Sequence, residues 1–269
     1  MVTRTEDRME VLFGFFGTQV SAILLIIAAF LSPGYSPLKD AVSSLGWGNV
    51  KSLFSISFVV SGSLCIPFYI YLERELINIK ESIRRLATGV SIFTCVCIAL
   101  VGIIPDKTYL DIFVLFHGFV ASVSFIGSAI YIVLYSYLMY NVPKAKMYEG
   151  PKFKKYIAYL GFFIGCILIV FLITNTIALT LYTITIPIIE WILTLSIYLW
   201  ITLTAIHLIS YKFFNIPGVY YRRSEYPEAL KKFEDALQIL NKLNLSEEPI
   251  SETLKENIEF LKKELEKET

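Results

Sequence analysis

The sequence predicts an all-α protein, in which a six-helix transmembrane bundle is followed by a cytoplasmic helical hairpin. The first observation is the composition: 55% of the 269 residues are hydrophobic and only 17% are charged, with a mean hydropathy of +0.62. Soluble domains are about half apolar and about a quarter charged, so this balance indicates a membrane protein. The second observation is the uneven charge, because Lys and Glu concentrate in residues 222–269.

Six apolar stretches account for a membrane domain over residues 1–214. A helix needs about 20 apolar residues to cross the hydrocarbon core. The first stretch follows Arg4 and Arg8 but is longer than a signal-peptide core, so we expect it to be retained. The fourth is overlong and should tilt or emerge from the bilayer, and Pro187 suits the start of the sixth. The expected spans are 11–32, 52–72, 87–105, 110–140, 156–181 and 186–211.

Basic residues in the connections predict the orientation. Fourteen Lys and Arg fall at the N-terminus, in the second and fourth connections and after the last span. Cytoplasmic loops carry the excess of Lys and Arg, so both termini should be cytoplasmic, in a multi-pass protein of the cell membrane. The opposite side carries only Lys39, Lys51 and Lys107.

Small and aromatic residues indicate how the spans pack. Gly161 and Gly165 form a GxxxG pattern, which lets helix backbones approach closely in lipid. Packing within the bundle is the favoured use of this pattern, and a homo-oligomer stays possible. Tyr and Trp near the span ends are typical of interfacial anchors. These aromatic residues are Trp47, Tyr109, Tyr140, Tyr156 and Trp191.

Residues 222–269 predict a cytoplasmic helical hairpin with two amphipathic segments. The first segment, from Tyr226 to Leu237, resembles the second half of a tetratricopeptide repeat in its pattern Tyr-x-x-Ala-Leu-x-x-Phe-x-x-Ala-Leu. Such arrays need about three repeats to bury their faces. The hairpin is therefore a plain coiled hairpin, a degenerate repeat capped by its own last helix, or a pair docked on a protein partner. The apolar positions are Ala229, Phe233, Ala236, Leu237, Leu240, Ile250, Leu254, Ile258, Leu261 and Leu265.

The polar residues on the outer side form a candidate ligand site. His117 lies about seven residues into the fourth span and Glu190 about four into the sixth. Both spans run inward, so at about 1.5 Å per residue the two lie within about 5 Å of the same depth. An ionisable residue inside the membrane is a functional hypothesis by default. We expect these two residues to touch, or to share one ligand, in an outer pocket that includes Asp40, Ser43 and Asp106.

Three segments carry a family resemblance. They are "YSPLKDAVSSLGWGNVKSLFSISFVVSGSL", "GIIPDK" followed by His117, and "IPIIEWILTLSIYLW". Their order and spacing resemble the six-span domain-of-unknown-function family 998, which is akin to the DRAM/Frag type of membrane proteins. The resemblance covers residues 11–212 and implies the six-span fold and the site around the helical histidine and the early glutamate of the last span. It implies no settled activity.

Three functions remain open. The favoured one is a non-catalytic module that binds a membrane lipid or a membrane partner and recruits a cytoplasmic protein through residues 222–269. The second is an enzyme acting on a lipid headgroup, with His117 as general acid or base and Glu190 or Asp40 orienting it. The third is a small transporter. No catalytic residue is assigned and no cofactor, metal or nucleic-acid partner is expected, since a zinc site needs about three ligands and His207 lies near the opposite end.

Overall fold

The structure is a computed structural model that describes residues 4–77, 79–104, 111–142, 153–182, 187–210, 226–243 and 249–266. Every regular element in these ranges is helical, which confirms the all-α prediction. The chain separates into two compact units, Met1–Phe213 and Phe214–Thr269.

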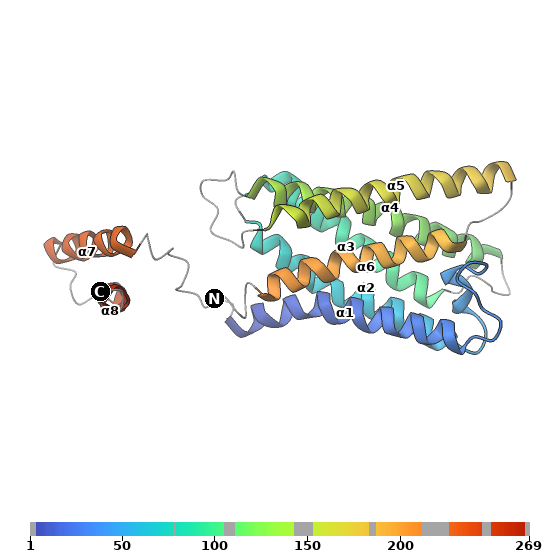
Figure 1. Ribbon diagram of the computed structural model, residues 1–269, viewed down its shortest axis with the longest axis horizontal. Helices are drawn as coiled ribbons and strands as arrows, with labels where there is room; N and C mark the ends of the chain where they lie inside the picture. The colour runs from blue at the N-terminus through green and yellow to red at the C-terminus, as the bar shows by residue number, and fades with distance from the viewer. Residues whose placement is uncertain are drawn as a thin grey trace. The chain divides into compact units, whose positions relative to one another are not determined.

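The first unit is an up-and-down bundle. Consecutive helices pack against each other and α6 packs back against α1, which closes the ring (Figure 1). A short 3-10 helix, η1, lies in the connection between α1 and α2. The elements are α1 (Arg4–Leu31), η1 (Val42–Gly46), α2 (Lys51–Glu75), α3 (Glu81–Ile103), α4 (Asp111–Asn141), α5 (Lys155–Tyr182) and α6 (Pro187–Ile209).

All six helices of this unit are long and apolar enough to cross a membrane, as predicted. The fourth, with 31 residues, would extend about 46 Å, which exceeds the roughly 30 Å of a hydrocarbon core. The third begins at Glu81, six residues before the predicted span at 87. Its first turns are charged yet ordered, because the buried Arg84 donates to Glu73 of α2 at 3.4 Å.

Small residues allow the first three helices to approach closely. A Cβ on Gly62 would lie 2.5 Å from the carbonyl oxygen of Cys95 on α3. Ser21 and Ser57 join α1 to α2, since each hydroxyl donates to the carbonyl of the other residue, at 2.7 and 2.9 Å. Lipid provides no hydrophobic drive between helices, so such close contacts and hydrogen bonds hold the bundle together.

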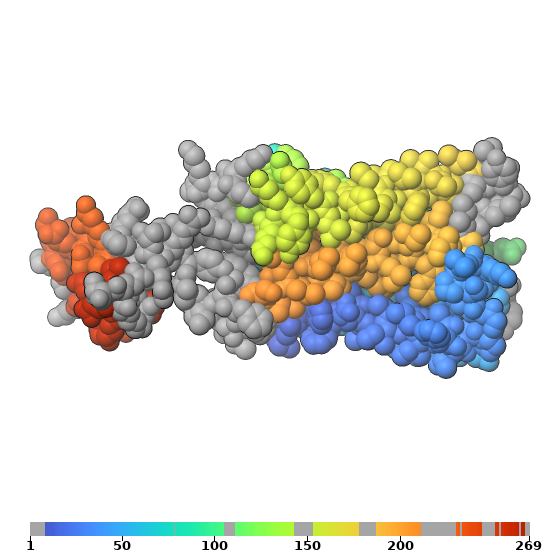
Figure 2. Space-filling view, in the orientation of Figure 1, coloured from blue at the N-terminus to red at the C-terminus, as the bar shows by residue number. Residues whose placement is uncertain are grey.

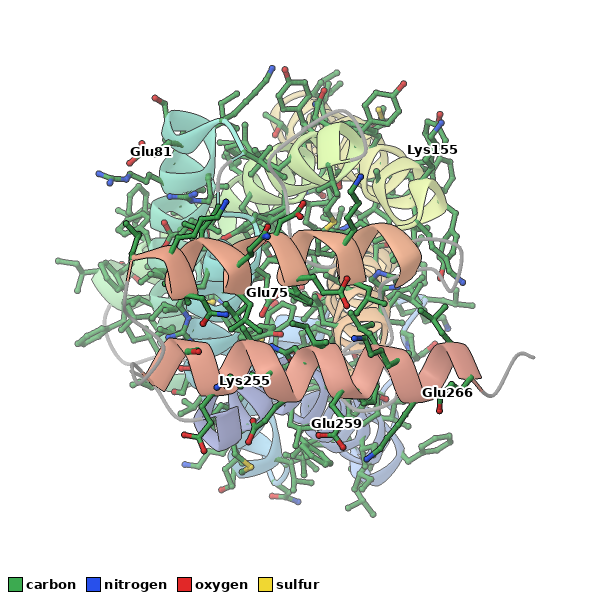
Figure 3. All side chains as sticks on the ribbon, turned by 90° about the vertical axis from the view of Figure 1, so that its left-hand side faces the viewer. Glu75, Glu81, Lys155, Lys255, Glu259 and Glu266 are labelled. Carbon is green, nitrogen blue, oxygen red and sulfur yellow. The ribbon has the colours of Figure 1, made fainter. Side chains whose placement is uncertain are left out.

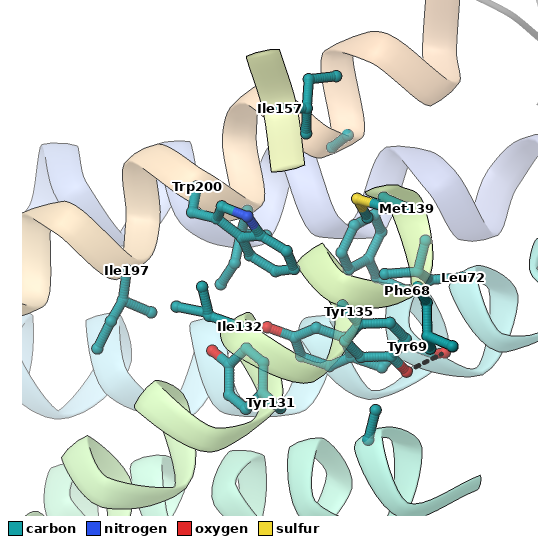
Figure 4. Close-up of a cluster of buried hydrophobic side chains, with 14 of the residues drawn as sticks. Phe68, Tyr69, Leu72, Tyr131, Ile132, Tyr135, Met139, Ile157, Ile197 and Trp200 are labelled. Atoms are coloured by element: carbon teal, nitrogen blue, oxygen red, sulfur yellow. Dashed lines mark hydrogen bonds between the residues drawn. The ribbon is translucent and has the colours of Figure 1, made fainter. Parts of the chain in front are cut away.

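An aromatic cluster fills the middle of the bundle. It joins α2, α4 and α6, and all four side chains are fully buried (Figure 4). The centroid of Tyr69 lies 4.9 Å from that of Tyr131 and 5.9 Å from that of Tyr135. Tyr135 also shares a 2.9 Å hydrogen bond with Thr88 of α3. The cluster consists of Tyr69, Tyr131, Tyr135 and Trp200.

Both glycines of the GxxxG pattern face the inside of the bundle. A Cβ on Gly161 would meet Ser136 of α4 and the Trp200 ring of α6, and one on Gly165 would meet Val133 of α4. These glycines thus let α5 approach its neighbours in the same chain.

Polar contacts concentrate where α1, α3 and α5 begin, the end seen in Figure 3. Arg74 of α2 forms an ion pair with Glu10 of α1, and Lys80 contacts the hydroxyl and ring of Tyr137 on α4. These contacts join α1 to α2, and the connection between α2 and α3 to α4, at the end opposite η1.

The second unit holds two helices, α7 (Tyr226–Lys242) and α8 (Pro249–Glu266), which lie side by side (Figure 3). Leu261 is buried against Leu230 and Phe233, and Lys262 forms a 2.9 Å ion pair with Glu234. The apolar stripes expected from the sequence therefore meet between the two helices.

We predict that Gly62→Ala lowers the stability of the bundle by about 1–3 kcal/mol, because the added methyl would push α2 away from the α3 backbone. Gly89→Ala is the matched control, since nothing lies within 4 Å of a Cβ there and Ala is the better helix former. Thermal unfolding of the purified protein measures both. Equal melting temperatures for the two variants would contradict the close approach.

Candidate functional site

The connection between α1 and α2 lies against the beginning of α6 (Figure 2). The Tyr35 hydroxyl accepts a 2.8 Å hydrogen bond from the indole N–H of Trp191 and donates to the carbonyl of Ala41 at 2.9 Å. Burial away from water raises the pKa of Tyr35 to about 12. Trp191 is only 6% exposed, so this aromatic residue holds the connection on α6 and is not the interfacial anchor that its position predicted.

A cavity of about 520 Å³ lies beneath this connection, inside the bundle. Its walls come from α2, α3, α4, α5, α6 and η1. Most of the wall is apolar, with Val42, Phe54, Phe58, Val101, Leu193 and Ile197. The polar side chains on the wall include Ser43, His117, Asn175, Glu190, Thr194 and Tyr198.

His117 is 3% exposed and lines this cavity from α4. Its Nδ1 lies 2.5 Å from the carbonyl oxygen of Ile104, just after α3 ends. The other ring nitrogen, Nε2, is buried and has no hydrogen-bond partner within the described part of the chain. A buried polar atom without a partner is costly, and a residue that carries one and lines a cavity is a candidate site residue.

Glu190 lies in the first turn of α6 and lines the same cavity. Its Oε2 accepts a 3.3 Å hydrogen bond from the backbone N–H of Ser43 in η1. A carboxylate in the first helical turn is also favoured by the helix dipole. The glutamate therefore connects the loop that covers the cavity to the helix that forms its wall.

The structure thus brings His117, Glu190 and Ser43 around one cavity. The direct contact between imidazole and carboxylate that we expected is not formed, because His117 Nδ1 pairs with a backbone carbonyl and Nε2 has no partner in the described ranges.

Asp40 is not among the residues that line the cavity. Its carboxylate accepts the backbone N–H of Ser36 at 2.8 Å, within its own turn, and it lines a separate hollow with Trp47 and Asn49. A short acidic side chain in a turn is often satisfied locally in this way, so the position of Asp40 in the pocket has to be corrected. Asp106 lies outside the described residues.

The sequence did not indicate several polar residues of the wall, among them Asn175, Thr194 and Tyr198. The amide of Asn175 inside an apolar span was a usable signal. Tyr198 is 6% exposed, and its hydroxyl donates to Ser61 of α2 at 3.2 Å. Nothing in the periodicity distinguishes this tyrosine from a core residue.

The cavity reaches the surface of the bundle along α4 and α5. Gly118 and Ser122 of α4 and Thr176 of α5 line it and are exposed. Since these positions lie within apolar helices that are able to span a membrane, the opening faces the region where lipid chains would lie.

Within the described ranges, no group of three or more His, Cys, Asp or Glu is placed to hold a metal ion.

We predict that Tyr35→Phe destabilises the protein by about 1–2 kcal/mol, because it leaves the Trp191 N–H and the Ala41 carbonyl without their partner. Tyr156→Phe is the control, since that ring is 57% exposed.

The neutral phenol of Tyr35 is favoured in the folded state, where its pKa is about 12, against about 10 in the unfolded state. The unchanged protein should therefore be more stable than Tyr35→Phe by the full amount below pH 10, and this difference in stability should be lost as the pH rises to 12. Unfolding at pH 8 and pH 11 tests this, and an advantage unchanged at pH 11 would contradict it.

A comparison with protein families supports the resemblance drawn from the sequence. The family model described as "Protein of unknown function (DUF998)" matches residues 16–207. Neither a search of curated proteins nor a search of solved structures found a match. The matched region extends over more than half of the chain and reaches from α1 to α6. This multi-pass helical protein therefore belongs to the DUF998 family of proteins of unknown function.

Proposed function

We propose that the bundle is a non-catalytic binding module for a membrane amphiphile, whose headgroup sits beside His117 and Glu190. The observation that carries this proposal is the cavity itself, which has two ionisable side chains at the η1 end and an apolar wall beyond them. Ligand sites commonly have this form, with volumes of about 300–1,000 Å³, a mostly apolar lining and a few polar groups that set orientation.

The lateral opening supports an amphiphile over a water-soluble ligand. Gly118, Ser122 and Thr176 carry the cavity to the surface of the apolar helices α4 and α5. A molecule entering there from the bilayer would place its chain against the apolar part of the wall. Its headgroup would meet the polar side chains near the loop.

Filling the cavity should abolish binding. We expect a photoreactive alkyl diazirine probe to label the purified protein on cavity residues, and Ala121→Phe to reduce that labelling at least tenfold by occupying the space. Ile126→Phe adds a ring on the same helix at an exposed position outside the cavity, so labelling should stay unchanged. Peptide mapping by mass spectrometry gives the readout. Labelling spread evenly over the outer faces of the helices and insensitive to Ala121→Phe would refute the proposal.

We also propose that both termini face the cytoplasm, in a cell membrane. The support is the charge distribution of the connections, with fourteen Lys and Arg against three. The hairpin of α7 and α8 would then be cytoplasmic. It presents exposed apolar side chains at Ile239, Leu243 and Phe260, and the tetratricopeptide-like pattern from Tyr226 to Leu237 suits a protein-binding role.

Cysteine labelling in intact cells tests this orientation. A cysteine in place of Lys39 should react with an impermeant maleimide, and one in place of Glu256 should react only after the membrane is opened. Reaction of both in intact cells would refute the orientation.

The protein partner is tested in opened membranes. Phe260→Cys should label more slowly there than in the purified protein, whereas the labelling rate of Glu256→Cys should not differ between the two samples. Equal rates for Phe260→Cys would argue against a bound partner.

One observation favours a second function, an intramembrane enzyme acting on a lipid headgroup. His117 lines the cavity, and its Nε2 has no partner in the described ranges, as is expected of a histidine that exchanges a proton with a ligand. Mass spectrometry of lipids incubated with the purified protein decides between the two. A product absent with His117→Gln would replace the binding module by the enzyme.

A further inference from the structure

The closed inner end of the cavity limits the chain of its ligand. We infer that the cavity takes an amphiphile with a single alkyl chain of about ten carbons, and that Ser128 and Ile197 set this length. This inference rests on the proposed binding function and specifies its ligand class. It follows from the length of the cavity, from its volume and from the way its inner end is closed.

The lining residues give the length of the cavity along the bundle. They run from His117 to Ser128 on α4 and from Ile189 to Tyr198 on α6. At about 1.5 Å per residue, these segments are about 16 Å and about 14 Å long. An extended alkyl chain advances about 1.3 Å per carbon, because its C–C bonds are about 1.5 Å long and zigzag. A small headgroup and about ten carbons therefore fit in line.

The volume of the cavity allows one such chain and excludes two. The cavity has a volume of about 520 Å³. A water molecule in the liquid occupies about 30 Å³, and a methylene group is of similar size, so about seventeen groups of this size fill the cavity. A ten-carbon chain with a small headgroup agrees with this volume, whereas two such chains exceed it.

Buried side chains close the inner end of the cavity. Ser128, Ile197 and Tyr198 line this end and are all buried. About one turn further along α4 and α6 are the fully buried rings of Tyr131 and Trp200, whose centroids lie 6.2 Å apart (Figure 4). Protein interiors are close-packed, so a longer chain has to displace these side chains before it can advance.

The lateral opening lies nearer the η1 end than this closed end does. On α4 the opening is lined by Gly118 and Ser122. Ser122 precedes Ser128 by six residues, which corresponds to about 9 Å of helix. A chain whose headgroup sits at the η1 end therefore passes the opening first and reaches the closed end with its tail. The tail is where extra methylenes lack space.

Straight-chain alcohols test this limit, because they share one neutral headgroup and differ only in length. Alcohols from 1-octanol to 1-hexadecanol compete with a ten-carbon alkyl diazirine probe on the full-length protein, at equal mole fractions in nonionic detergent micelles. Micelle and cavity are both apolar, so chain length by itself provides little drive. We expect 1-octanol and 1-decanol to compete within about threefold of each other and 1-hexadecanol at least about tenfold more weakly, because overpacking a closed site is costly.

Two substitutions at the closed end should move the limit in opposite directions. Ile197→Ala removes three carbons there and should shift the fall in competition to chains about two carbons longer. Ser128→Leu fills the same end and should shift it to shorter chains, which also keeps the test open if Ile197→Ala does not fold. Ile157→Ala is the matched control, since it removes the same three carbons from a buried position on α5 outside the cavity and should leave the limit unchanged.

The outcomes separate the two proposals. Competition that stays level from 1-octanol to 1-hexadecanol would overturn the chain limit and leave the binding module standing. A fall at the same chain length in the unchanged protein, Ile197→Ala and Ser128→Leu would also overturn it, because the limit would then lie elsewhere. Failure of every alcohol to compete, together with labelling insensitive to Ala121→Phe, would overturn the binding module itself.

Discussion

The packing of α2, α4 and α6 around one aromatic cluster is the constraint on which the rest of the bundle depends. Tyr69, Tyr131, Tyr135 and Trp200 are fully buried and occupy the space between these helices. In lipid, helices associate through such van der Waals contacts, since apolar burial by itself provides no drive. Beyond the cluster, Ser128 of α4 and Ile197 of α6 already line the cavity. The aromatic side chains thus fill one part of the bundle and leave the η1 end hollow.

The connection between α1 and α2 completes the hollow. Its attachment to α6 includes the polar contacts of Trp191 with Tyr35 and of Glu190 with the Ser43 backbone. Because Glu190 belongs both to this attachment and to the cavity wall, a ligand that engages its carboxylate would act directly on the loop above. In the proposed function, binding and loop position would therefore be coupled through this side chain.

The hydrogen-bonding sense of the site follows from its backbone surroundings. The Ile104 carbonyl oxygen accepts a hydrogen bond from Nδ1 of His117, and the Ser43 N–H donates one to the carboxylate of Glu190. Both residues line the cavity, and the imidazole Nε2 has no hydrogen-bond partner in the described part of the chain.

The sequence by itself determined the six apolar helices, because about 20 apolar residues suffice for a span whatever their neighbours are. It also indicated that His117 and Glu190 lie at similar depth, because the helix rise per residue is constant. Only the tertiary structure decided which side chains meet. The Tyr35–Trp191 contact, the turn that occupies Asp40 and the cavity position of Asn175 depend on how each helix is rotated about its axis and where each loop lies. Those rotations are set by packing between segments far apart in the chain, which hydrophobic periodicity does not encode in nearly uniformly apolar spans.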